Sequence, residues 1–288
     1  CTSLVSIGDL NNVESIANEA FSNCSALEHV DKLDKITSIG QNAFKGCTAL
    51  KSIGSLHNLE TIGKGAFNGC SALEHVDDLY SLTRLEYDVF SHCVSLISVD
   101  CSDKLTAIGS SAFFGCKALV SIGDLSNVTS IESSVFRGCI ALKSIGNMPK
   151  LESIGMQCFM GCTALETVGD LSSLKEIPSE TFDGCTSLVS IGDLSNVTII
   201  GSYGFNQCKK LTSIPNLGSL ERVDQFAFSG CESLALLGNL RKLTSFGNSP
   251  FVNSPFHNCP NLVLEVLPDS AAEQYAKNYS MRYTYITE

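Results

Sequence analysis

The chain has 288 residues, a formal net charge of -11 and a pI near 4.9. Its hydrophobic content of 44% is enough for a packed interior, which excludes a globally disordered chain. The negative charge leaves no electrostatic footprint for nucleic acid or an anionic membrane, and no apolar run approaches the roughly 18 residues needed to cross a bilayer. We therefore predict neither nucleic-acid binding nor membrane insertion.

A repeat begins at the first residue. Eleven cysteines follow one another at intervals of 23 residues from Cys1 to Cys231, and Cys259 follows after 28. From Cys24 onward, each has a Phe three residues before it, and every one has a Leu three residues after it. One unit reads C-x-x-L-x-x-I-x-x-L-x-x-L-x-x-I-x-x-x-A-F-x-x. Apolar residues at every third position fit neither an amphipathic helix nor an alternating strand, so the repeat predicts a solenoid whose stacked coils share one core.

Within each unit we expect a short strand centred on the Ile six residues past the Cys, as at Ile53 and Ile122. Gly-Asp pairs such as Gly123-Asp124 then turn the chain, and a second short extended piece follows, as at 128–131. The A-F-x-x-C segment is expected to form a helical turn or a compact loop on the outer side. Successive strands should pair in parallel.

The repeat breaks once, where five extra residues and two prolines at 247–255 predict a surface loop. After the last Cys, Ser270 and Glu273 have the spacing of a capping box, which predicts a short helix, and 281–287 reads as a closing strand. We therefore divide the chain into repeats at 1–262 and a C-terminal cap at 263–288. The cap predicts a complete carboxyl end, whereas the amino end opens mid-unit and is expected to be trimmed.

The unit L-x-x-I…L-x-x-I-x-x-x-A-F-x-x-C resembles the BspA-like class of leucine-rich repeats, found in surface proteins of gut bacteria and of some protozoan parasites. The resemblance covers Cys1 to about Leu262. With the cap, it implies a right-handed leucine-rich repeat solenoid with a parallel β-sheet on the concave face, little helix and a small C-terminal α/β cap. It also implies an extracellular or cell-surface, adhesin-like role. Many such repeats carry Ile-Pro after the first strand, where this chain has Gly-Asp or a near relative.

The periodic cysteines could be buried thiols, disulfides or metal ligands. Strict periodicity places them in one interior file, where a thiol behaves as a small hydrophobe. In-register thiols point parallel to one another, which fits the geometry of a disulfide poorly. We therefore expect reduced, buried thiols. Cys158 falls in a column usually held by Ala and should also be buried, whereas Cys101, placed in a turn after a strand, is the best candidate for an exposed thiol.

The sequence gives little support for a catalytic site or a metal site. Glu-His-Val-Asp recurs at 28–31 and 74–77, but two coils separate the copies, so His29 and His75 should stand roughly 10 Å apart and cannot share a metal ion. The Asp-bearing turns suggest a calcium ladder, yet each unit supplies only one or two carboxylates, which favours turn chemistry. No Ser-His-Asp, nucleotide-binding or zincin motif has credible spacing. We predict no enzymatic activity, cofactor or metal.

The sequence instead predicts a scaffold that binds a protein ligand through its concave strand surface. The candidate surface consists of His29, Asp31, Ser52, His75, Asp77, Ser98 and Ser121, and Ile97 and Val120 add an apolar edge. The alternative is a structural or assembly module that self-associates through the solenoid ends. A carbohydrate-binding role is disfavoured, because the repeat columns are expected to expose no aromatic side chains.

Overall fold

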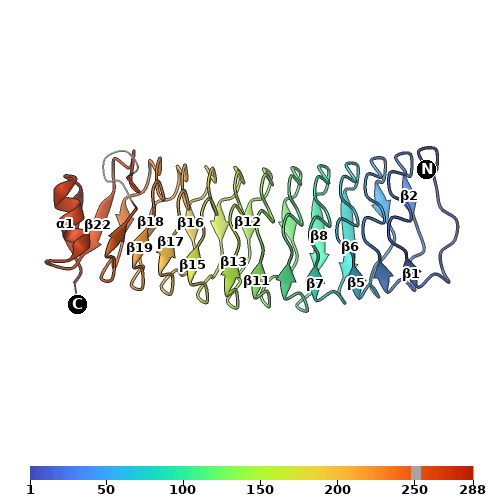
Figure 1. Ribbon diagram of the computed structural model, residues 1–288, viewed down its shortest axis with the longest axis horizontal. Coiled ribbons are helices and arrows are strands. Elements are labelled where there is room, and N and C mark those ends of the chain that lie inside the picture. The colour runs from blue at the N-terminus through green and yellow to red at the C-terminus, as the bar shows by residue number, and fades with distance from the viewer. Residues whose placement is uncertain (248–253, 288) are drawn as a thin grey trace.

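Each repeat unit closes into one coil with two short strands. The computed structural model describes residues 1–247 and 254–287, and the coils stack side by side along its long axis, with the two chain ends at opposite ends of the stack (Figure 1). The loop predicted at 247–255 lies largely outside the described residues. The predicted parallel solenoid with little helix is confirmed.

The first strands of successive coils form what we call the first-strand row. Its members are β2 (His29–Val30), β4 (Ser52–Ile53), β6 (His75–Leu79), β8 (Ser98–Cys101), β10 (Ser121–Ile122), β12 (Ser144–Ile145), β14 (Thr167–Val168), β16 (Ser190–Ile191), β18 (Ser213–Ile214), β20 (Leu236–Leu237) and β22 (Val263–Val266). Pairing along this row is parallel, and Ser98, for example, lies opposite Ser121. Because the register equals the repeat length, each sequence column becomes a column of neighbouring side chains.

The second strands form the second-strand row. Its members are β1 (Ser15–Ile16), β3 (Ser38–Ile39), β5 (Thr61–Ile62), β7 (Arg84–Leu85), β9 (Ala107–Ile108), β11 (Ser130–Ile131), β13 (Ser153–Ile154), β15 (Glu176–Ile177), β17 (Ile199–Ile200), β19 (Arg222–Val223) and β21 (Ser245–Phe246). This row is also parallel. In most of these two-residue strands the second side chain is buried and the first is not, because alternate residues of a strand point to opposite faces.

The core is built from columns of Phe, Cys and Leu side chains. Phe rings of adjacent coils stack with centroids 5.2 to 5.9 Å apart, and Phe44 to Phe228 are fully buried. The cysteine thiols also bond between coils: Cys116 Sγ donates to the Phe90 carbonyl at 3.0 Å, and this contact recurs from Cys47 to Cys231. The same carbonyl accepts the N–H of Cys93. Each thiol therefore links two coils as well as filling space.

The A-F-x-x-C segment is a compact loop and not a helical turn. The N–H of Phe90, for example, donates to the carbonyl of Ala112 in the next coil, where a helix would bond within its own segment. Left-handed backbone at Ser111 and Gly115 also breaks any helical path. Among the described residues, no helix is long and apolar enough to cross a membrane.

The burial of Cys101 corrects the expectation that it is exposed. β6 and β8 extend further than the other early strands, so Cys101 ends a strand instead of lying in a turn. The backbone of the next coil packs against it at Gly123, where an added Cβ would come within 2.5 Å of the Cys101 nitrogen. Cys101 is 8% exposed, and burial raises its pKa to about 12. Cys158, in contrast, is fully buried as predicted.

The C-terminal cap forms as the capping box predicts. The helix α1 (Ala271–Asn278) begins after Ser270, whose hydroxyl accepts the Glu273 N–H at 3.2 Å, while the Glu273 carboxylate accepts the Asp269 N–H at 2.8 Å. The closing strand β23 (Arg282–Tyr285) pairs in parallel with β22. The Tyr275 ring stacks on Phe246 at 3.9 Å, so the cap continues the core. The boundary between repeats and cap at 262/263 stays a prediction.

Candidate binding surface

The predicted polar residues form a ladder on the first-strand row. Each faces outward because the following Val or Ile points into the core. His29 Nδ1 lies 2.9 Å from Ser52 Oγ, and His75 Nδ1 lies 3.0 Å from Ser98 Oγ. Ser121 continues the ladder opposite Ser98. The structure therefore brings these five residues together in one line across five coils.

The two predicted aspartates do not meet each other. Asp31 and Asp77 are both exposed, but Gly54 occupies the equivalent position in the coil between them. Asp77 instead lies beside Asp78 and Asp100, which the sequence reasoning did not include. The sequence signal that could have revealed this acidic cluster is Asp-Asp at 77–78, where other coils have Gly-Asp. This part of the surface is therefore strongly acidic.

An exposed tyrosine accompanies these carboxylates. Tyr80 is 46% exposed, and the negative charges of Asp78 and Asp100 help to raise its pKa. Tyr87 is exposed as well. The expectation that the repeat columns show no aromatic side chains is wrong, because these tyrosines occupy positions that are polar or small in most other coils.

The expected apolar edge is present next to the ladder. Ile97 and Val120, one residue before β8 and β10, are 39% and 40% exposed. In the preceding coils the same column holds Glu28 and Lys51, which form an ion pair with an N–O distance of 2.9 Å. The ladder therefore runs from a charged edge in the early coils to an apolar edge near β8 and β10.

Ser55, His57 and Asp78 come within hydrogen-bonding distance but do not form a catalytic triad. Ser55 Oγ donates to Asp78 Oδ2 at 2.6 Å and lies 3.0 Å from His57 Nδ1. His57 Nε2 faces the side-chain nitrogen of Asn58 at 2.9 Å, which requires Nε2 to accept and Nδ1 to donate. In a triad the histidine accepts the serine proton. Here His57 Nδ1 donates to Ser55, and the serine proton goes to Asp78. Within residues 1–247 and 254–287, no three His, Cys, Asp or Glu side chains cluster closely enough to hold a metal ion.

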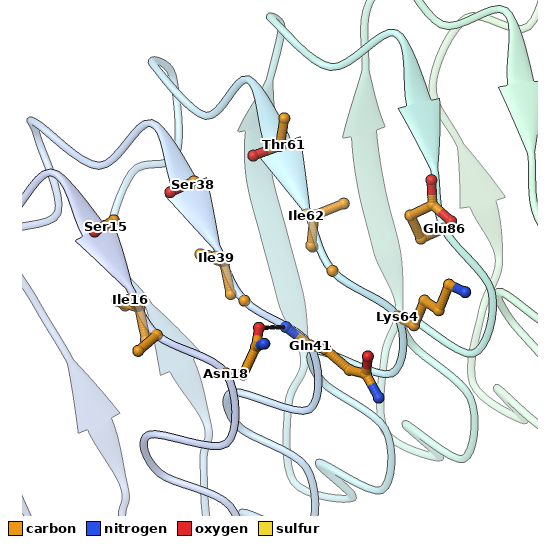
Figure 2. Close-up of a pocket in the computed structure, with 13 residues that line it drawn as sticks. Ser15, Ile16, Asn18, Ser38, Ile39, Gln41, Thr61, Ile62, Lys64 and Glu86 are labelled. Atoms are coloured by element: carbon orange, nitrogen blue, oxygen red, sulfur yellow. Dashed lines mark hydrogen bonds between the residues drawn. The ribbon is translucent and has the colours of Figure 1, made fainter.

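A hollow of about 680 Å³ lies on the second-strand row, where the sequence predicted no site. Figure 2 shows Ser15, Ser38 and Thr61 in line on successive strands, with Lys64 and Glu86 at one end. The Asn18 side chain accepts the N–H of Gln41 at 2.8 Å along this wall.

The hollow arises from the column that follows the second strand. From residue 63 onward, this column alternates glycine with a larger residue: Gly63, Glu86, Gly109, Glu132, Gly155, Pro178, Gly201, Asp224 and Gly247. A Cβ at Gly63 would overlap the backbone of Gln41, so the coils approach too closely there for a side chain. Ala17 and Gly40 interrupt the alternation and leave the surface open. That interruption is the sequence signal that could have located the hollow.

The repeat family is established by comparison with known families. Residues 1–97, 83–169 and 153–263 match the family described as BspA type Leucine rich repeat region (6 copies). The chain belongs to the BspA-type leucine-rich repeat family. The resemblance drawn from its unit is thereby confirmed.

Solved structures support the fold of this BspA-type chain. A leucine-rich repeat protein from Bacteroides ovatus is 26% identical, with a TM-score of 0.63 over 99% of this chain and 88% of its own. A leucine rich cell surface protein from Faecalibacterium prausnitzii is 24% identical, with a TM-score of 0.52 over 92% of this chain and 85% of its own. No curated protein sequence matches the chain.

Proposed function

We propose that this chain is a non-enzymatic scaffold that binds a protein ligand through the first-strand row between His29 and Ser121. The observation that supports this most directly is that three adjacent coils expose large side chains near the polar ladder: Tyr80 follows the end of β6, and Ile97 and Val120 directly precede β8 and β10. Leucine-rich repeat proteins are typically interaction scaffolds, so the family supports this reading.

The chemistry of the surface favours a basic ligand. Tyrosine is enriched among residues that dominate binding energy, and apolar neighbours help to exclude water from such contacts. Asp77, Asp78 and Asp100 add negative charge beside Tyr80. The short serine side chains of the ladder leave room for a partner to approach. We therefore expect a ligand that presents Lys or Arg next to an apolar side chain.

We further propose an extracellular or cell-surface, adhesin-like role, which the family supports. The thiols are compatible with it. Burial raises the pKa of Cys139, Cys162 and Cys185 well above the ordinary value, and only the thiolate attacks disulfides. The core thiols would therefore resist oxidation outside the cell.

The test is to probe a yeast-displayed panel of secreted and cell-surface proteins with the fluorescently labelled chain. Tyr80→Ala, and separately the pair Ile97→Ser and Val120→Ser, should each weaken binding of a recovered ligand about tenfold or more. Val189→Ser is the matched control, because Val189 is 41% exposed in the same column but outside the proposed surface. A recovered ligand that ignores the first two changes would contradict the proposal.

The self-associating assembly module is distinguished by mass in solution. Sedimentation equilibrium at micromolar concentration should show a monomer if the chain acts by binding ligands. Concentration-dependent growth in mass would favour the assembly role instead. At the carboxyl end, α1 and β23 cover the last coil, so stacking there would have to use the exposed edge of β23.

A further inference from the structure

The outer turns carry a local departure from the repeat. Two columns lie there, one directly after the Phe and one directly after the Cys, and their side chains are exposed or half-buried except at Ser91 and Ser229, which are buried. The first reads Ser22, Lys45, Asn68, Ser91, Phe114, Arg137, Met160, Asp183, Asn206 and Ser229, and the second reads Thr2, Ser25, Thr48, Ser71, Val94, Lys117, Ile140, Thr163, Thr186, Lys209 and Glu232. Four consecutive outer turns, each running from a Phe to the residue after the next Cys, thus contribute one apolar residue apiece to these columns, namely Val94, Phe114, Ile140 and Met160. The outer turns on either side contribute none to them. We call these four residues, with Lys117 and Arg137, the outer-turn patch.

The patch replaces hydrogen bonds that hold other coils together. In the column after the Cys, hydroxyl groups donate to the preceding coil: Ser71 Oγ bonds the Thr48 carbonyl at 3.2 Å, and Thr186 Oγ1 bonds the Thr163 carbonyl at 3.4 Å. Val94 and Ile140 have no hydroxyl to make this bond. An apolar residue in this column therefore removes a hydrogen bond between coils. Because hydrogen bonding between the coils does not account for these residues, a role at the surface is favoured.

The patch forms a hollow with a mostly apolar lining. Its volume is about 460 Å³, and Ile140 within it is 48% exposed. His92 closes one side with its ring edge-on to Phe114, the centroids 5.1 Å apart. His92 has a φ of 61° in a column that holds Gly in most coils, a conformation that is strained for a side chain. Asn23, Gln207 and Asn258 adopt the same conformation in this column, so the backbone of His92 follows the fold.

The two cations of the patch pair with no carboxylate in the part of the chain that the structure describes. The ammonium of Lys117 has no hydrogen-bond or ion-pair partner among the described residues, whereas Lys209 in the same column pairs with Glu232 at 3.2 Å. The difference arises because the residue one coil later is Ile140 in the first case and Glu232 in the second. The Arg137 guanidinium lies 5.7 Å from the Phe114 ring centre and donates to the Gln157 side-chain oxygen at 2.7 Å, a neutral group.

We propose that the outer-turn patch is a second binding surface, which takes an acidic peptide segment of a partner protein. An apolar side chain of the segment fills the hollow between Phe114 and Ile140, and carboxylates beside it pair with Lys117 and Arg137. The charge argument is local: these two unneutralised cations flank an apolar hollow in a chain of net charge -11. An anionic lipid surface fits less well, because the remaining negative charge would repel it. This surface goes beyond the proposed function, since it shares no residue with the ladder.

The test uses a phage-displayed library of random 12-residue peptides, selected on the immobilised chain, followed by fluorescence polarisation with the enriched peptides. We expect enrichment of peptides with an aromatic or aliphatic residue flanked by Asp or Glu. Lys117→Glu should weaken their binding at least tenfold, whereas Lys209→Glu, which makes the same charge change in the same column, should leave it within twofold. Binding should also weaken as salt increases.

Folding does not confound this test. Ile140→Thr and Met160→Asn introduce residues that other coils carry in the same columns, so these variants should keep the wild-type melting temperature while losing at least tenfold in peptide affinity. Enriched peptides that are neutral or basic, no enrichment at all, or equal effects of Lys117→Glu and Lys209→Glu would each overturn the proposal. So would flotation of the chain with phosphatidylserine vesicles that depends on Lys117.

Discussion

Phe113 and Phe114 are adjacent in the chain but belong to two different regions of the molecule. Phe113 is fully buried, and its ring stacks at 5.5 Å on Phe90 and on Phe136. Phe114 lies half-buried in an outer turn, between coils that carry Ser91 and Arg137 at the same position. An interior column must repeat because each ring packs on its own copy, whereas an outer column can vary without disturbing the stack. The fold therefore constrains the interior columns and tolerates variation in the outer ones.

The largest expected effect is on stability, from Phe113→Ala. Removing a fully buried ring between two others should lower the free energy of unfolding by about 3–5 kcal/mol. Phe114→Asn, which introduces a residue found at this position in other coils, should change it by about 0.5 kcal/mol or less. Urea denaturation of both variants measures the difference. A loss below about 1 kcal/mol for Phe113→Ala would mean that the interior column does not carry the stack.

A smaller loss is expected from Gly155→Ala. An added Cβ at Gly155 would overlap the backbone of Ser133, so the two coils would have to separate locally at a cost of about 1–3 kcal/mol. Gly146→Ala is the control, because an added Cβ at Gly146 meets nothing within 4 Å. Equal melting temperatures for the two variants would show that the contact between coils is not close at the second-strand row.

A pH-dependent effect on stability is expected from the cap. Hydrogen bonds from Lys277 and Tyr285 lower the pKa of Glu273 to about 2. A carboxylate with a lowered pKa stabilises the fold above its ordinary pKa near 4.5, and the stabilisation disappears as the pH falls toward 2.

The wild-type chain should therefore melt at a higher temperature than Glu273→Gln at pH 6, and the gap should close between about pH 4.5 and pH 2. Glu265→Gln is a useful comparison, because Glu265 lies on the neighbouring strand β22. A gap that stays constant across this pH range would show that Glu273 does not hold the cap through its charge.

The smallest expected effect is the extent to which the native chain reacts with a thiol reagent. Cys1 is exposed and Cys259 is half-buried, while the other 12 of the 14 cysteines are buried. Only these two should react quickly, and the rest should react only after denaturation. Counting free thiols with and without denaturant, without reductant, tests this. Early reaction of Cys101 would contradict its place in the core, and paired oxidation of the periodic cysteines would contradict the hydrogen-bonded thiol column.

Some features of the candidate surface could not be predicted because the strands are not all the same length. The Gly-Asp columns predict a turn after every first strand, but β6 and β8 continue to Leu79 and Cys101. That extension buries Cys101, a thiol that the spacing placed in a turn. Backbone pairing between coils decided this position, and local residue preference did not.

The sequence by itself determined the period, the interior columns and the capping box, because an in-register stack gives every residue of a column the same surroundings. Only the tertiary structure decided which irregular residues meet. Arg84 Nη2 donates to Glu132 Oε1 at 2.7 Å although 48 residues separate them, since Gly109 leaves the space between them open. Lys209 pairs with a carboxylate one coil away, whereas Lys117 has no such partner within residues 1–247 and 254–287. These contacts depend on the side chains of neighbouring coils, which a repeat consensus does not contain.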